Sequence, residues 1–204
     1  MSTIVNLRGT SGAGKSTVAH WLLANNGHEV VERFGVRGNR PLVYKLYTKA
    51  TGLLTPLFVI GPYTSPCGGC DAITDYKNIL PGLLERYAKK GDILFEGLLI
   101  SGGYGSVGRK LGELRDDGHR VVFALLDTPL ETCLERVNAR RRARGVMEPV
   151  NPVNTEQKYK AAHASQRKIA EEYGHECVMI NHKRPVRDVL ALFGVELKRE
   201  PKHG

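Results

Sequence analysis

Apolar and polar residues alternate along the chain in blocks that predict strands and helices in turn. Short apolar runs bounded by glycine, proline or charged residues predict strands at 4–7, 28–34, 92–97, 121–127 and 177–181. Helical spacing predicts a helix starting at Val18, one across 72–90 with an interruption at Pro81, and one that follows a loop at 101–108 and ends near Asp117. Three more helices are predicted from Pro129 to Arg144, across 155–173 with Gly174 as the cap, and from Pro185 onward. This alternation predicts an α/β fold whose mainly parallel sheet has five strands and helices on both faces.

The stretch from 35 to 70 interrupts this pattern. It is rich in glycine, proline, threonine and tyrosine, and it ends in Pro66-Cys67-Gly68-Gly69-Cys70-Asp71. Irregular segments of this length inside a compact domain are usually functional, or they contain short helices. A chain of 204 residues fits one domain. We therefore expect a single domain over 1–204, with 35–75 as a substrate-binding insertion.

The segment after the first predicted strand matches G-x-x-x-x-G-K-[ST] at every fixed position. It reads Gly9-Thr10-Ser11-Gly12-Ala13-Gly14-Lys15-Ser16 and leads into a helix-compatible run. Glycines let consecutive N–H groups point into one concavity, and the helix that follows adds the positive end of its dipole. The motif predicts that ATP and Mg²⁺ bind here, with Lys15 at the β- and γ-phosphates and Ser16 at the metal; the expected contacts are Gly9, Ser11, Gly12, Ala13, Gly14, Lys15, Ser16 and Thr17. The alternative is a glycine-rich turn that holds nothing.

Two acids end predicted strands and so fall at the edge of the sheet where ligands gather. Glu96 ends an apolar strand, where it could hold a water on Mg²⁺ or take the proton from an attacking hydroxyl. It could also be a helix cap or an ion-pair partner. Asp127 ends the next strand but precedes Thr128-Pro129, which makes an ordinary cap equally plausible.

Arginines recur at every fourth position on one face of the helix after Pro129. They are Arg136, Arg140 and Arg144, and no acid lies between the first and the last. Arginine pairs with phosphate oxygens and stabilises a transferring phosphoryl group. We expect a lid over about 136–154 in which Arg136 and Arg140 act in catalysis and Arg140 and Arg144 contact the nucleotide. A solvated cationic helix face is the alternative.

The insertion carries the expected acceptor site. Cys67-x-x-Cys70 lacks the second ligand pair that a structural zinc site needs. The tight glycine turn before Asp71 could instead place that carboxylate on a helix end or on a substrate. Tyrosines among cations in this stretch could stack a base. We take the substrate-binding candidates to be Asp71, Tyr63 and Arg37.

The composition narrows the partners. The net charge of +9 is spread over both halves and favours a polyanionic partner, although a merely basic surface would give the same number. The longest apolar run, Leu53–Ile60, is broken by Pro56 and is too short to span a bilayer. We expect no signal peptide before the first strand, and four cysteines without one would suggest the reducing cytoplasm. We expect no membrane association.

The chain resembles the small P-loop kinases over nearly its whole length. The resemblance rests on Gly9–Thr17, on Leu94-Phe95-Glu96-Gly97, and on Asp127-x-Pro129-x-Glu131 followed by Arg136 and Arg140. It implies a three-layer sandwich with strand order 2-3-1-4-5 and an arginine lid over ATP. The GTPase motifs Asn-Lys-x-Asp and Asp-x-x-Gly are missing, and the chain is too short for a transporter ATPase.

Within that class, Gly61-x-Tyr63 and Cys67-Gly68-Gly69-Cys70-Asp71 resemble the phage 5-hydroxymethyluracil DNA kinases. This resemblance implies phosphorylation of a base hydroxymethyl group in DNA, in the host cytoplasm, with DNA containing a modified pyrimidine and a nucleotide as partners. Leu98-Leu99-Ile100 replaces the Asp-Arg motif of thymidylate kinases, which disfavours a simple thymidylate kinase. Two alternatives stay open: a kinase of a free nucleoside, nucleotide or metabolite, and a nucleotide-binding regulator without catalysis.

Overall fold

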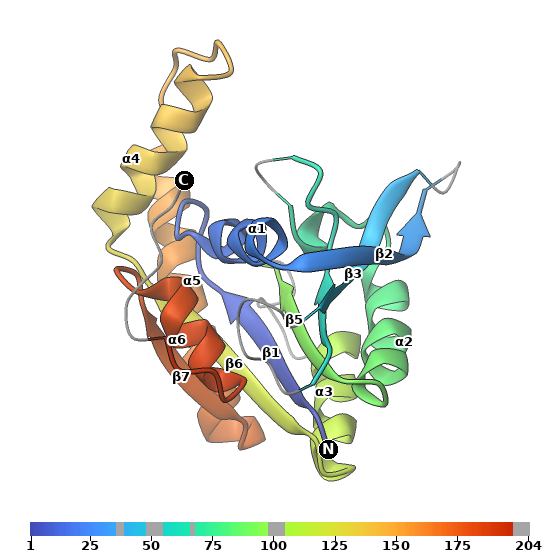
Figure 1. Ribbon diagram of the computed structural model, residues 1–204. Helices are drawn as coiled ribbons and strands as arrows, with labels where there is room; N and C mark the ends of the chain where they lie inside the picture. Colours follow the sequence, from blue (N-terminus) through green and yellow to red (C-terminus); the bar gives the residue numbers. More distant parts are fainter. Residues whose placement is uncertain (36–38, 48–54, 66–67, 98–104, 198–204) are drawn as a thin grey trace.

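A seven-stranded sheet is the centre of the computed structural model, which describes residues 1–35, 39–47, 55–65, 68–97 and 105–197 (Figure 1). The strands are β1 (Thr3–Arg8), β2 (Gly27–Phe34), β3 (Arg40–Tyr47), β4 (Leu57–Ile60), β5 (Asp92–Glu96), β6 (Arg120–Asp127) and β7 (Glu176–Asn181). The helices are α1 (Lys15–Asn25), a 3₁₀ turn η1 (Cys70–Ala72), α2 (Tyr76–Ala88), α3 (Ser106–Asp116), α4 (Leu130–Arg142), α5 (Pro152–Tyr173) and α6 (Pro185–Leu192).

The strand order is β2-β3-β4-β5-β1-β6-β7, and five neighbouring strands, from β4 to β7, run parallel. Counted along the chain, those five follow the expected order 2-3-1-4-5. The prediction of only five strands is wrong, because β2 and β3 pair antiparallel with each other and β3 pairs antiparallel with β4. The sheet is therefore mixed and mostly parallel.

Two strands lie in the stretch predicted to be irregular, and that prediction is also wrong. In β3, Leu42, Val43 and Tyr44 are all buried, and all four residues of β4 are buried. Strands covered on both faces lose the alternation that identifies a strand in a sequence. The segment 28–34, expected to be the second strand of the parallel sheet, is instead the edge strand of the hairpin.

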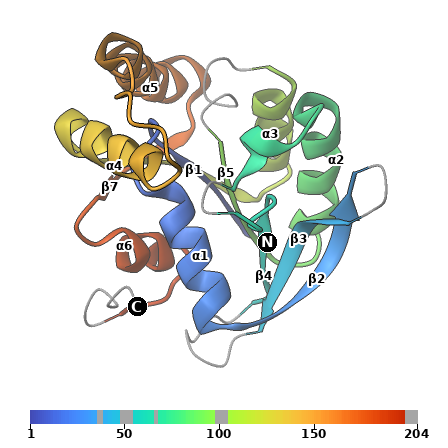
Figure 2. The same ribbon diagram turned by 90° about the horizontal axis from the view of Figure 1, so that it is seen from above.

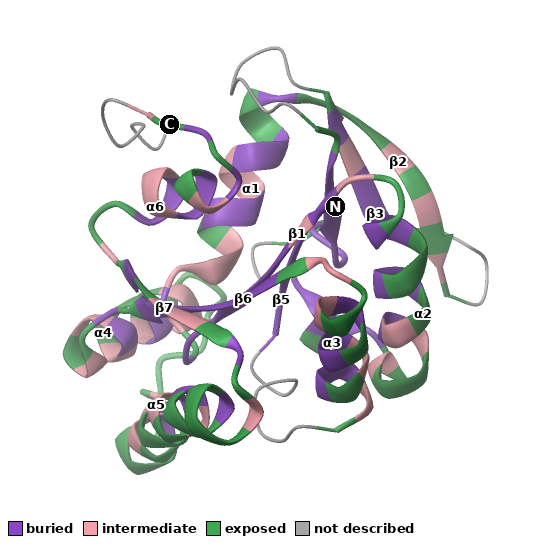
Figure 3. Ribbon diagram, turned by 90° about the horizontal axis from the view of Figure 1, so that it is seen from below, coloured by how far each residue is buried: buried purple, intermediate pink, exposed green. Residues whose placement is uncertain are grey.

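Helices cover both faces of the sheet, so the molecule has three layers. Figures 1 and 2 show α1 and α6 on one face and α2, α3 and α5 on the other, while α4 extends beyond the carboxyl ends of the strands. Seen from below, the central strands are buried and the outer helices present exposed residues to solvent (Figure 3). None of the described helices has the length and apolar character needed to cross a membrane.

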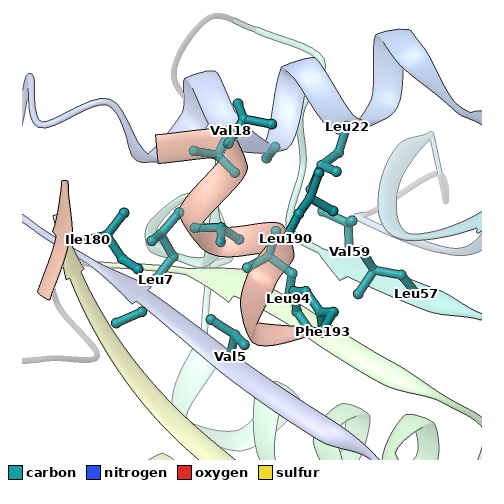
Figure 4. Close-up of a cluster of buried hydrophobic side chains, with 14 of the residues drawn as sticks. Val5, Leu7, Val18, Leu22, Leu57, Val59, Leu94, Ile180, Leu190 and Phe193 are labelled. Atoms are coloured by element: carbon teal, nitrogen blue, oxygen red, sulfur yellow. The ribbon is translucent and has the colours of Figure 1, made fainter. Parts of the chain in front are cut away.

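The core is divided between the two faces. Val5 and Leu7 of β1 face α1 and α6, where they pack with Val18, Leu22 and Leu190 (Figure 4). The other face packs Ile4 against α2 and α3. The side-chain period of two along β1 produces this division. The tight packing on both faces fixes where β1 ends and therefore where the glycine loop begins.

Helix boundaries mostly follow the prediction. The α2 helix runs through Pro81, where an interruption was expected. A proline cannot donate to the carbonyl four residues earlier, and here that carbonyl, on Lys77, accepts a hydrogen bond from the Ser106 hydroxyl at 2.8 Å. The α5 helix begins earlier than expected because the Asn151 side chain accepts from the Val153 and Asn154 amides.

Candidate functional site

A cavity of about 680 Å³ opens at the carboxyl ends of β1 and β5. Parallel strands bring these ends together, and the loops that follow them form the walls. The lining combines the glycine loop, the segment around η1, the end of β5, α4 and the loop after β7; its residues are Ser11, Gly12, Ala13, Gly14, Lys15, Ser16, Thr17, Gly68, Asp71, Ala72, Glu96, Gly97, Arg136, Arg140, His182 and Pro185.

The glycine loop has the backbone that its sequence requires. Gly9, Gly12 and Gly14 all have positive φ, a conformation that other residues rarely adopt. A Cβ at Gly12 would lie 2.4 Å from the carbonyl oxygen of Cys133 in α4. The loop therefore packs directly on the backbone of α4, and the hydroxyl of Thr128 adds a 2.8 Å hydrogen bond to the carbonyl of Ala13.

The cations of this wall are bound to backbone oxygens. Lys15 donates from Nζ to the carbonyls of Gly9 and Thr10, at 2.8 and 3.1 Å. Arg136 donates to the carbonyls of Gly12 and Ala13, at 3.3 and 3.4 Å. Both side chains line the cavity, so a phosphate group entering it would meet two cations.

The expected arginine row is divided. Arg136 and Arg140 line the cavity, and Arg140 also borders a second cavity between α4 and α5. Arg144 lies beyond the end of α4, is exposed, and does not line the cavity. The structure thus brings two of the three arginines to the glycine loop.

Glu96 faces this wall from the end of β5. Its side chain is 2% exposed, and Oε1 has no hydrogen-bond partner among the described residues. Burial raises the pKa of Glu96 to about 7, while the Lys15 charge and the Ser16 hydroxyl oppose the shift. Burial likewise lowers the pKa of Lys15, which the charges of Glu96 and Asp71 partly restore. Burial thus poises the Glu96 carboxyl to accept a proton near neutral pH.

The other predicted site residues do not all reach the cavity. Asp71, in η1, is exposed and lines the cavity beside Glu96. Tyr63 is buried and does not line the cavity. Asp127 borders a neighbouring cavity of about 660 Å³ instead. Arg37 and Cys67 lie outside the described residues, and the Cys70 thiol is buried, donating to the carbonyl of Ile60 at 3.5 Å.

No function was predicted from the sequence for the residues that line the cavity after β7. His182 comes from the turn between β7 and α6, Pro185 is the first residue of α6, and both line the cavity. Nδ1 of His182 lies 2.7 Å from the carbonyl oxygen of Asp127. Their position just after the last predicted strand, at the same edge of the sheet as the glycine loop, was the available signal.

Comparison with known proteins identifies the family. A family model described as "5-hmdU DNA kinase" matches residues 1–173. The chain is 41% identical over 167 residues to the 5-hmdU DNA kinase of Pseudomonas phage PaMx11, covering 81% of this chain and 84% of that protein. It is 29% identical over 143 residues to 5-hmdU DNA kinase 1 of Salmonella phage ViI, covering 66% and 57%. The 5-hmdU DNA kinase of Pseudomonas phage M6 is 27% identical over 151 residues, covering 71% and 75%. The chain belongs to the 5-hmdU DNA kinase family.

Proposed function

We propose that this protein transfers the γ-phosphoryl group of ATP to the hydroxymethyl oxygen of 5-hydroxymethyluracil in DNA, with Mg²⁺ as cofactor. Membership of the family gives the reaction class and the modified base. The observation that carries the assignment of residues is the meeting of a phosphate-binding glycine loop and a buried carboxyl in one cavity. Its relatives are phage proteins, so the reaction would take place in the host cytoplasm.

The donor side of the reaction belongs to the glycine loop. The loop amides and Lys15 hold the β- and γ-phosphates, with Gly9, Ser11, Gly12, Ala13, Gly14 and Thr17 forming the backbone around them. Arg136 and Arg140 offset the charge that develops on the transferring group. The segment 136–154 acts as a lid, supported by the projection of α4 and its following loop from the fold (Figure 1). Arg144 contacts the nucleotide only if that lid closes.

The residues present suit a magnesium ion. Ser16 and Glu96 supply a hydroxyl and a carboxylate beside the glycine loop, and oxygen ligands are those that Mg²⁺ prefers. When bound, Mg²⁺ offsets phosphate charge during transfer. Glu96 would hold the ion either directly or through a water.

The acceptor side belongs to Glu96 and Asp71. The hydroxymethyl proton passes to Glu96 as the acceptor oxygen bonds to the γ-phosphorus. The bond from that phosphorus to the β-phosphate oxygen breaks, and ADP leaves. Asp71, exposed in the cavity wall, hydrogen-bonds the acceptor, and the insertion 35–75 surrounds the base. A base paired in a duplex must leave the stack to reach this site.

The test is phosphoryl transfer from γ-labelled ATP to a panel of acceptors. The panel contains duplex DNA with 5-hydroxymethyluracil, the same duplex with thymine, the free modified nucleoside and its monophosphate. We expect label in the modified DNA alone. Label only in the free nucleoside or nucleotide would refute the DNA substrate, and ATP binding without any labelled acceptor would indicate a regulator instead.

The same assay tests the role of Asp71 separately, through the two KM values. Removing the charge in Asp71→Asn should raise the KM for modified DNA severalfold and change the KM for ATP much less, because the proposed function places this side chain against the acceptor. An equal rise in both KM values would show that Asp71 affects nucleotide binding as well as acceptor binding.

A further inference from the structure

The glycine motif of the insertion encloses the catalytic carboxyl. A Cβ at Gly69 would lie 2.7 Å from Cγ and 3.0 Å from Oε1 of Glu96. A Cβ at Gly68 would lie 2.5 Å from Cδ1 of Tyr63, and one at Gly61 would lie 2.9 Å from Cα of Gly69. Contacts under 3.0 Å are closer than a real Cβ tolerates. These three glycines therefore let the backbone press Tyr63 and Glu96 into one corner.

Tyr63 is held rigidly in that corner. Its ring meets the imidazole of His20, from α1, edge-on with centroids 5.7 Å apart, and the ring of Tyr44, from β3, at 6.1 Å. The side chain is 7% exposed. Aromatic pairs at these separations prefer such geometries. Its ring thus has little freedom to move toward the cavity or away from Glu96.

The two polar groups in this corner are both unpartnered. Neither the Tyr63 hydroxyl nor Glu96 Oε1 has a hydrogen-bond partner within the described part of the chain. A buried polar group without a partner costs free energy. They share one corner, since the adjacent glycines Gly68 and Gly69 pack against Tyr63 and Glu96 respectively. The Glu96 charge adds to the burial that raises the pKa of Tyr63. The Tyr63 hydroxyl in turn opposes the rise in the pKa of Glu96.

We propose that Tyr63 is a positioning residue, whose hydroxyl donates to the Glu96 carboxylate during turnover and holds it toward Ser16 and the acceptor. This inference rests on the role of Glu96 in the proposed function. Tyr63 does not line the cavity, so it acts through Glu96 and does not contact the acceptor itself. The motif Gly61-x-Tyr63 with Gly68-Gly69 then has one purpose, which is to set this carboxyl.

The deciding experiment is a double-mutant cycle on Tyr63 and Glu96. Single-turnover transfer to modified DNA is measured for wild type, Tyr63→Phe, Glu96→Gln and the double variant. Tyr87→Phe is the matched control, because it removes the hydroxyl of a buried tyrosine in α2 that lies outside the insertion and does not line the cavity. Thermal unfolding is recorded for each variant, and Tyr63→Phe should be as stable as wild type, because it removes an unpartnered hydroxyl.

We expect Tyr63→Phe to slow transfer about tenfold with the KM for ATP and for DNA unchanged, and Tyr87→Phe to leave the rate unchanged. In the Glu96→Gln background, Tyr63→Phe should cost nothing further, because residues that act as a unit are not additive. Two results would overturn this inference and leave the proposed function intact. One is an equal loss of rate from Tyr63→Phe in the wild-type and Glu96→Gln backgrounds, and the other is no loss from Tyr63→Phe although Glu96→Gln is slow. A wild-type rate in Glu96→Gln would instead remove the proposed role of Glu96, and the inference with it.

Discussion

The two walls of the cavity are built by opposite means. On the donor wall, which is the glycine loop with Arg136, both cations are bound to backbone carbonyls before any ligand arrives. On the acceptor wall, formed by the segment 68–72 with Glu96, neither Oε1 of the buried carboxyl nor the hydroxyl of Tyr63 has a hydrogen-bond partner among the described residues. Within the glycine loop, the Thr10 hydroxyl is the one buried side-chain group without a hydrogen-bond partner among the described residues.

This difference indicates what each wall must do. Phosphates are strongly charged, so a wall that receives them needs fixed donors and a shape that the backbone can supply. A hydroxyl acceptor is neutral, so it must be recognised by a group that gains a hydrogen bond only when the acceptor is present. In the proposed function, leaving Oε1 of Glu96 unpartnered lowers the stability of the free protein and keeps the carboxyl available for that contact.

The largest effect should come from the donor wall. Lys15→Ala should abolish transfer, by a factor of about a thousand or more, because it removes the charge that meets the β- and γ-phosphates. The folding of the variant is checked by circular dichroism, and its rate by single-turnover transfer. Lys89→Ala, which changes an exposed lysine on the surface next to α2, is the control and should retain the wild-type rate. Wild-type turnover in folded Lys15→Ala would remove the P-loop assignment.

The second effect separates two arginines on one helix. Arg136→Ala should lower kcat about 10- to 100-fold, because Arg136 lines the cavity and contacts the glycine loop. Arg142 is exposed near the end of the same helix and does not line the cavity, so Arg142→Ala should change kcat by less than about twofold. Steady-state kinetics on modified DNA compare the two. Equal losses would show that α4 acts through its overall charge.

The glycines of the two walls allow a sharper comparison. Gly12→Ala should destabilise the fold by about 2–4 kcal/mol, since its Cβ would meet the backbone carbonyl of Cys133 in addition to the strain of positive φ. Gly69→Ala should destabilise less, because its Cβ would meet the Glu96 side chain, which can turn away, and should lower kcat instead. Gly194→Ala is the control for strain alone, with positive φ and open space around it.

Chemical denaturation and kinetics on the same three preparations decide the outcome. If Gly69→Ala unfolds as easily as Gly12→Ala, the acceptor wall is held by backbone packing, and the contrast between the two walls fails.

The smallest effect concerns stability and pH. The folded protein holds a proton on Glu96 to about pH 7, whereas the ordinary pKa of this side chain is 4.5. The folded state therefore binds more protons than the unfolded chain over this interval, and the free energy of unfolding falls as the pH rises through it. Glu96→Gln should be more stable than wild type by about 2–3 kcal/mol at pH 8 and nearly equal at pH 4.5.

Urea denaturation across pH measures this difference, with Glu135→Gln, an exposed acid on α4, as the control. A wild-type protein that gains stability over the same pH range would show that Glu96 is ionised at low cost in the free protein.

The sequence predicted the donor wall far better than the acceptor wall. The glycine loop is a local arrangement, and its residues, Lys15 and Ser16 included, follow from one continuous motif. Glu96 and Asp71 could be named because they stand at the end of a strand and after a glycine turn. The roles of Gly69 and Tyr63 could not, because both depend on contacts between β5 and a segment about thirty residues earlier.

The fold shows the same limit. Four of the five parallel strands, β1, β5, β6 and β7, followed from apolar runs, while β3 and β4 were missed because burial on both faces removes their alternation. His182 was missed for a different reason. A loop residue after the last strand has no local sequence pattern. It reaches the cavity only because β6 pairs with β1 and β7 pairs with β6.

The division of labour between the walls is tested most directly by one variant in two assays. In Glu96→Gln, the dissociation constant of ATP is measured by isothermal titration, and the rate of transfer to 5-hydroxymethyluracil DNA is measured in a single turnover. We expect ATP affinity within about threefold of wild type and a transfer rate lowered by a factor of about a hundred or more. Equal losses in binding and transfer, or no loss in transfer, would contradict the account.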